Sequence, residues 1–241
     1  MPTIKTQAVI LKKTDWRDND RILTLLSPSH GRMEALCRGC RRTKSPLLAA
    51  SENFALGEYV LFSSNGRLTV TGCMLADSFY PLRQDYDLLK YASYILSVSE
   101  IVSRDGEPAL ELFTLLTRSL SRLAYKNMEP RSVTGAFLLL LAALEGWRPR
   151  LSHCVLCGKS FEPAGLPLFS IAEGGAVCRS CPRPLTGVIP VSPREIIWMK
   201  DVLLVGIEKT ACPPEDTPLR LLMSYIESRL ERRPPAAKLI P

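Results

Sequence analysis

A β-hairpin pattern stands out in the stretch 58-EYVLFSSNGRLTVTGCML-75. Two β-prone runs, 58–64 and 67–75, flank the dipeptide Asn65-Gly66. Both central positions of a two-residue hairpin turn need positive φ, which Asn and Gly tolerate better than other residues. The stretch therefore predicts two antiparallel strands joined by a tight turn.

Three more β-prone runs precede this hairpin, at residues 6–13, 21–28 and 32–37. The third run alternates between apolar residues on one face and the charged Arg32 and Glu34 on the other. Its apolar positions are Met33, Ala35 and Cys37. Five short strands in under 80 residues, with no helix of crossover length between them, favour a small closed or partly open barrel.

Beyond Pro81 the apolar residues recur at the 3.6-residue spacing of an α-helix. Helices are predicted at about 85–104, 108–123 and 131–146, then from 192 onward and at 217–233. Asp85 is a candidate N-cap, and 192-SPRE-195 has the pattern of a capping box. The helix at 131–146 is apolar almost all round, as expected for the central helix of a bundle.

These patterns predict an α+β chain of more than one domain. Residues 1–80 are expected to form the β-barrel domain, and residues 81–241 an α-helical domain. A segment rich in Gly, Pro and Cys interrupts the helices at about 150–190, and we call it the insert.

The composition favours a polyanionic partner. The 241 residues include 31 Lys and Arg against 24 Asp and Glu, a formal charge of +7. The N-terminus lacks the apolar core of a signal peptide, and the run 136-AFLLLLAAL-144 is too short to span a bilayer. We therefore expect a cytoplasmic protein with no membrane partner, whose eight cysteines stay reduced.

Four cysteines in the insert have the spacing of a metal site. They follow the pattern Cys-x2-Cys-x20-Cys-x2-Cys, at Cys154, Cys157, Cys178 and Cys181. Two residues between cysteines allow one turn to point both sulfurs at a metal, and four thiolates complete a tetrahedral shell. The pattern predicts one structural Zn2+, with four free or disulfide-bonded cysteines as the alternative. His153 is a supporting or surface residue in this interpretation.

A second Cys-x-x-Cys lies in 37-CRGCRRTKS-45, among four cations. With the zinc shell already filled, Cys37 and Cys40 are interpreted as packing residues, since Cys37 falls on the apolar face of its strand. A redox pair or a minor metal role remains the alternative. The four cations predict contacts to the phosphates of a nucleic-acid strand, and a solvated loop is the other interpretation.

Further cations surround this loop in the predicted barrel. The candidate DNA-binding residues are Arg38, Arg41, Arg42 and Lys44 in the loop, with Lys12, Lys13, Arg17, Arg21, Arg32 and Arg67 elsewhere. Trp16 is a candidate for stacking on bases, or else a half-buried turn residue. We expect binding that tolerates many sequences, because no helix resembles a base-recognising element.

Catalytic motifs give little support to an enzyme. The chain has two histidines, and it contains no phosphate loop, nucleophile elbow or His-Glu-x-x-His motif. We therefore expect no enzymatic activity and no small-molecule substrate. The alternatives are a zinc-containing nucleic-acid-processing enzyme and an adaptor that binds only proteins.

The chain resembles the bacterial recombination mediator family RecO. The resemblance lies in 15-DWRDNDRILTLLSPSHGRMEALCRGCRRTKS-45, in the order of barrel then helices, and in 151-LSHCVLCGK-159 with 178-CRSC-181. The DNA-binding stretch of the family maps onto Arg38, Gly39, Arg41, Arg42, Lys44 and Ser45. Cys37 and Cys40 stand where the family usually has small residues such as alanine.

This resemblance implies an OB-fold, a helical bundle and a zinc-binding insert. It also implies binding of single- and double-stranded DNA, annealing of complementary strands, and RecA loading together with RecR and single-stranded DNA-binding protein. The acidic tail of that last partner would need cations beside an apolar pocket. The candidates are Arg118, Arg122 and Lys126, with Leu115 or Leu123 nearby. Such a protein is expected in the cytoplasm, associated with the nucleoid.

Overall fold

The computed structural model describes residues 3–126, 128–161, 167–181, 187–209 and 217–240. The chain forms two compact units. One comprises Met1–Lys126 with Pro234–Pro241, and the other comprises Asn127–Arg233. Each unit is described below by itself.

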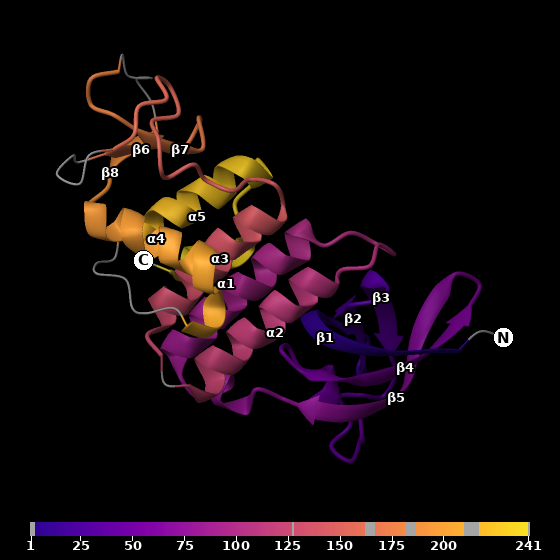
Figure 1. Ribbon diagram of the computed structural model, residues 1–241. Helices are drawn as coiled ribbons and strands as arrows, with labels where there is room; N and C mark the ends of the chain where they lie inside the picture. The colour runs from indigo at the N-terminus through magenta and orange to yellow at the C-terminus, as the bar shows by residue number, and fades with distance from the viewer. Residues whose placement is uncertain (1–2, 127, 162–166, 182–186, 210–216, 241) are drawn as a thin grey trace. The chain divides into compact units, whose positions relative to one another are not determined.

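Five strands of the first unit close into a barrel (Figure 1). They are β1 (Thr3–Trp16), β2 (Asp20–Ser27), β3 (Gly31–Cys37), β4 (Leu56–Ser64) and β5 (Arg67–Asp77), in the order β1-β2-β3-β5-β4. The predicted hairpin is confirmed, with Asn65 and Gly66 at φ values of 49° and 73°. All neighbours are antiparallel except β3 and β5, which pair in parallel at only two positions.

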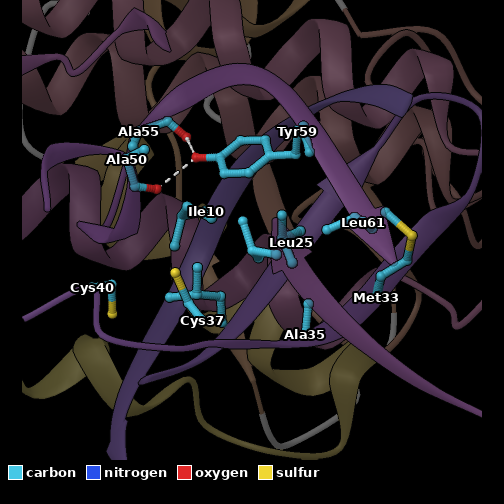
Figure 2. Packing of buried hydrophobic residues seen from close by; sticks show 13 residues of the cluster. Ile10, Leu25, Met33, Ala35, Cys37, Cys40, Ala50, Ala55, Tyr59 and Leu61 are labelled. Carbon is cyan, nitrogen blue, oxygen red and sulfur yellow. Dashed lines mark hydrogen bonds between the residues drawn. The ribbon is translucent and has the colours of Figure 1, made fainter. Parts of the chain in front are cut away.

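The inside of the barrel is filled by apolar side chains from every strand (Figure 2). Tyr59 is fully buried, and its hydroxyl donates to the carbonyl of Ala50 at 2.7 Å (Figure 2). Cys37 and Cys40 belong to the same core, at 1% and 0% exposure, and neither forms a disulfide. The inward direction predicted for Cys37 is therefore confirmed. Burial raises the pKa of the Cys37 thiol, which makes its nucleophilic thiolate form scarce.

Two helices pack with the barrel in the first unit, α1 (Tyr86–Val102) and α2 (Leu110–Tyr125). The predicted N-cap of α1 is confirmed, because the Asp85 carboxylate accepts the amides of Asp87 and Leu88. Short 3-10 segments complete this unit, η1 (Ala49–Ser51), η2 (Tyr80–Arg83) and η4 (Pro235–Leu239).

The loop between α1 and α2 lies along the turn between β2 and β3. The Arg32 amide donates to the carbonyl of Arg104 at 2.9 Å, and the Ala109 amide donates to the carbonyl of Pro28 at 3.0 Å. Gly31 sits in the contact with φ at 62°. A Cβ added to Gly31 would lie 2.0 Å from the carbonyl oxygen of Glu107, so only glycine fits this approach.

The described residues of the second unit form three α-helices and a small sheet. The helices are α3 (Pro130–Leu144), α4 (Pro193–Val205) and α5 (Thr217–Leu230), with η3 (Ile207–Lys209) after α4. The sheet has the order β7-β6-β8, from β6 (Leu168–Ser170), β7 (Gly175–Val177) and β8 (Val188–Pro190). The predicted capping box is confirmed: the Glu195 amide donates to Oγ of Ser192, and the Ser192 amide donates to Oε2 of Glu195.

The predicted α+β class is confirmed by the barrel, the helices after it and the cluster of four cysteines. The change from strands to helices lies near residue 80, whereas the compact units divide after Lys126, because α1 and α2 pack with the barrel. A domain boundary between residues 80 and 81 stays a prediction. Among the described helices, none has the length and apolar character needed to cross a bilayer.

Candidate nucleic-acid interface and metal centre

The outer face of β1, β2 and β3 carries three rows of side chains across the strands. The first row is Lys12, Thr24 and Glu34, on β1, β2 and β3 in turn. The second row is Thr14, Ile22 and Leu36. The third row is Trp16 of β1 and Asp20 of β2. The rows run from charged, through apolar, to aromatic as they approach the β1–β2 turn. A surface of this kind has separate places for phosphates and for bases.

Two hollows lie on this outer face. The smaller, of about 410 Å³, is lined by Trp16, Ile22, Glu34, Leu36 and Arg67, among others. The larger, of about 540 Å³, is lined by Arg32, Glu34, Glu100 and Asp105, among others. Glu34, Gly66 and Leu68 belong to both, so the hollows adjoin.

Residues 38–45, the basic loop, are held against the β1–β2 turn by their backbone. The Gly39 amide donates to Oδ1 of Asp20 at 2.8 Å, and the Arg41 amide donates to the carbonyl of Asn19 at 3.1 Å. Within the loop, the amides of Arg42 and Ser45 donate to the carbonyls of Gly39 and Arg42. The loop therefore has a fixed backbone, and it lies beside the turn that carries Arg17 and follows Trp16.

Arg21 is placed differently from the other candidate cations. It is buried, and its guanidinium donates to Asp15 at 3.1 Å, to Glu52 at 2.8 Å and to Ser51. Burial alone would raise the pKa of Glu52, but hydrogen bonds from Lys13 and Arg21 outweigh it and lower that pKa. These contacts tie β1 and the end of η1 to the start of β2, so Arg21 is a buried structural residue that does not face solvent.

Four further candidate cations have acidic partners on the protein. Lys13 pairs with Glu52, and Lys12 pairs with Glu100 at 3.2 Å. Arg32 binds Asp105 through two nitrogens, at 2.7 and 3.1 Å. Arg41 lies 3.4 Å from Asp15 and also donates to the carbonyl of Arg17.

The remaining five candidates are exposed and, within the described ranges, form no ion pair. They are Arg17, Arg38, Arg42, Lys44 and Arg67. Trp16 is 47% exposed and lines the smaller hollow. It is thus half-buried, and its exposed part is accessible for stacking on a base. Arg17, Trp16 and the basic loop come together through the β1–β2 turn, while Arg67 lies across the smaller hollow.

The apolar pair Ile22 and Leu36 and the carboxylate of Glu34 were not predicted to be part of a site. Alternation in 32–37 already placed Glu34 on the face opposite Met33, Ala35 and Cys37. Alternation could not predict the register of β3 with β2 or the pairing of β3 with β5, and these bring the lining residues of the hollows together.

The four insert cysteines converge as predicted. The sulfurs of Cys154 and Cys181 lie 3.8 Å apart, those of Cys157 and Cys178 3.7 Å, and those of Cys178 and Cys181 3.4 Å. All four lie within 4.8 Å of one another. Tetrahedral Zn2+ with bonds of about 2.3 Å would separate its sulfurs by about 3.8 Å, whereas a disulfide needs about 2.05 Å. The geometry therefore fits a metal ion better than two disulfides.

The electrostatics of the cluster also fit a cation. Hydrogen bonding with Ser180, followed by that with Cys181, lowers the pKa of the Cys178 thiol to about 6. The hydrogen bond to Cys178, followed by that to Cys157, raises the pKa of Cys181 to about 12. The Cys178 thiolate thus forms easily, whereas Cys181 resists ionisation beside it. A divalent cation would offset the repulsion between the two thiolates.

Local backbone structure supports the two Cys-x-x-Cys turns. Gly158 adopts φ of 74° directly after Cys157, and the Cys178 amide donates to the sulfur of Cys154 at 3.3 Å. The insert is joined to α5, because Arg229 donates to the carbonyls of Ile171 and Ala172. His153 is exposed and is not one of the four clustered ligands.

The candidate residues for a partner's tail lie along α2. Arg118 is exposed and Arg122, one helical turn later, is half-buried, while Lys126 caps the helix end and is exposed. Leu115 is half-buried, and Leu123 is buried in the core. Binding of a tail here stays a prediction.

Comparison with known proteins places the chain in a family. A family model described as "Recombination protein O N terminal" matches residues 1–79, and one described as "Recombination protein O C terminal" matches residues 83–238. The chain belongs to the recombination protein O family. Curated RecO relatives bear the name "DNA repair protein RecO", which refers to DNA repair and not to a reaction.

Three of these RecO relatives show how far the similarity extends. The protein of Myxococcus xanthus is 34% identical, over 94% of this chain and 92% of its own length. That of Streptomyces avermitilis is 32% identical over 96% of both chains. That of Alkaliphilus metalliredigens is 34% identical over 74% of this chain and 72% of its own. The resemblance to RecO found in the sequence is thus confirmed across the barrel and the helices.

Proposed function

We propose that this chain is a non-enzymatic recombination mediator that binds single- and double-stranded DNA and anneals complementary strands. In this proposal it acts with RecR and single-stranded DNA-binding protein to promote RecA loading. The observation that carries the DNA-binding step is the basic loop, whose exposed cations stand beside Trp16 on the outer face of a five-stranded barrel. Barrels of this type bind single strands over a basic face with aromatic rings.

The cations divide into two roles in this proposal. Arg38, Arg42 and Lys44 are exposed and lack protein partners in the described chain, so they are available to phosphates without breaking an ion pair. Arg17 and Arg67 extend this surface. The paired cations hold the surrounding structure in place: Arg41 links the loop to Asp15, and Arg21 links β1 to Glu52 after η1.

The insert has a structural role in this proposal, with Zn2+ as the metal. Its four thiolates would fill a tetrahedral shell, which leaves no position for an activated water. Zinc bound there would supply folding energy for the turns that carry the cysteines, whose residues 156–160 are exposed.

The partner proposals rest on the RecO family and on charge. The acidic tail of single-stranded DNA-binding protein would meet the basic side of α2 at Arg118, Arg122 and Lys126. RecR, and the loading of RecA, complete the proposed activity.

A salt titration of single-strand binding tests the basic loop. If the four loop cations, Arg38, Arg41, Arg42 and Lys44, each contact one phosphate, the expected slope of log affinity against log salt is near −3, at about 0.7 per contact. Replacing Arg38, Arg42 and Lys44 by Gln is expected to reduce that slope by about 2. A fourfold rise in salt then weakens wild-type binding about fifty-fold and variant binding about threefold.

A matched control removes the same charge from other elements of the first unit. The substitutions Lys5→Gln, Arg104→Gln and Lys238→Gln are all at exposed positions. The slope of this control is expected to differ from the wild-type slope by no more than about 0.7, the contribution of one phosphate contact. Equal slopes for the loop variant and wild type would overturn the assignment of the loop to DNA.

Annealing of two complementary oligonucleotides separates the mediator from the alternatives. The wild-type protein is expected to accelerate annealing and leave both strands intact, and the triple loop variant is expected to be slower. Loss of DNA that depends on a divalent metal would instead favour a nucleic-acid-processing enzyme. Binding to acidic proteins with no affinity for DNA would favour a protein-only adaptor.

A further inference from the structure

One carboxylate stands where the two hollows of the barrel meet. Glu34 is exposed on β3, opposite Thr24 of β2, and lines both the smaller and the larger hollow. No ion pair or hydrogen bond of its side chain is found within the described part of the chain. Its oxygens are therefore available to a ligand.

The groups around Glu34 in the smaller hollow suit a nucleobase. Trp16 offers an exposed ring for stacking, and Ile22 and Leu36 form an apolar surface between the ring and the carboxylate. Arg67 lines the same hollow and can bind a phosphate. Because a carboxylate repels phosphate, bases rather than backbone are expected to face β3 at this point.

The hydrogen-bonding pattern of a carboxylate selects among the four bases. A carboxylate only accepts, and it does so through two neighbouring oxygens. An unpaired guanine presents two neighbouring donors, N1–H and the 2-amino group, on its Watson–Crick edge. Adenine and cytosine present an amino group next to an acceptor nitrogen, and thymine presents N3–H between two carbonyls. Guanine alone can meet both oxygens of Glu34 without an opposing acceptor.

We propose that Glu34 binds the Watson–Crick edge of an unpaired guanine in the smaller hollow, and so biases the barrel towards guanine-containing single strands. This inference rests on the proposed single-strand binding and adds a base preference to it. A bias of this kind coexists with broad binding, because the basic loop contacts phosphates of any sequence.

Competition between two oligonucleotides tests the inference. One is oligothymidylate of about 15 nucleotides, within the site size of such barrels. The other carries guanines separated by runs of thymine, so that it forms neither pairs nor quadruplexes. Wild-type protein is expected to bind the second about tenfold more tightly, within the discrimination given by one bidentate contact. Glu34→Gln is expected to bring the two affinities within about twofold.

Two controls separate base recognition from charge. Glu111→Gln removes a carboxylate from the exposed first turn of α2, which lines neither hollow, and should keep the guanine preference. Inosine lacks the 2-amino group and should lose most of the preference, whereas 7-deazaguanine keeps the Watson–Crick edge and should retain it. Equal binding of guanine and inosine, or a preference that survives in Glu34→Gln, would overturn the inference. Failure to bind oligothymidylate at all would instead contradict the proposed function.

Discussion

Removing the metal from the four-cysteine insert is expected to unfold the insert and leave the barrel folded. Structural zinc in small domains contributes on the order of 10–16 kcal/mol at neutral pH, and such segments are commonly unfolded without it. The turns that carry the cysteines lie outside the three short strands, and residues 156–160 are exposed, so little burial in those turns would replace that contribution. Chelation should release one zinc per chain and open the insert to protease at Lys159 and Arg179, which are exposed.

Cysteine substitutions give this experiment its control. Cys154→Ser together with Cys181→Ser should reduce the zinc content towards zero and produce the same cleavage pattern. Cys37→Ala changes a cysteine of the barrel core and should keep one zinc per chain, because Cys37 lies outside the four-sulfur cluster. A folded, protease-resistant insert without metal would contradict a structural zinc site.

Gly31→Ala is expected to separate the α1–α2 loop from the barrel. The new methyl group would lie 2.0 Å from the Glu107 carbonyl oxygen and 2.6 Å from that of Arg104, both backbone atoms that cannot turn aside. Positive φ adds about 1–2 kcal/mol for a residue with a Cβ, and each hydrogen bond lost to the displaced loop adds about 1 kcal/mol. We expect a total destabilisation of about 3 kcal/mol or more.

Gly66→Ala is the matched control for backbone strain. Gly66 also has positive φ, at 73°, but a Cβ there would meet no atom within 4 Å. Its cost should stay near 1–2 kcal/mol. Hydrogen exchange distinguishes the two: in Gly31→Ala the amides of 31–34 and 103–109 should lose protection together, whereas Gly66→Ala should leave both segments unchanged. Similar exchange in both variants would show that the close approach has no role in stability.

Features set by neighbouring residues in the sequence were the ones that could be predicted. The Asn65-Gly66 turn, the Ser192 capping box and the cysteine pairs each depend on a few consecutive positions whose backbone chemistry is local. The alternation in 32–37 likewise fixed the direction of Cys37, because the side-chain period of a strand is two.

Features that depend on partners far along the chain could not be predicted. Arg21 looked like one cation among ten, but Glu52, brought near by η1, pairs with it and the surrounding fold buries it. Glu34 looked like an ordinary surface carboxylate until the register with β2 and the approach of β5 placed it between two hollows. The close approach at Gly31 depends on a loop more than 70 residues away. No local pattern encodes such distances.

The backbone hydrogen bonds of the basic loop have a thermodynamic consequence. A segment that folds when it binds loses conformational entropy and shows a large negative heat-capacity change. Here the amides of Gly39, Arg41, Arg42 and Ser45 already donate to protein acceptors before any strand arrives. Only long side chains would gain order on binding, and they would regain freedom when the strand leaves. In the proposed annealing activity, such a loop would release a strand to its complement without refolding.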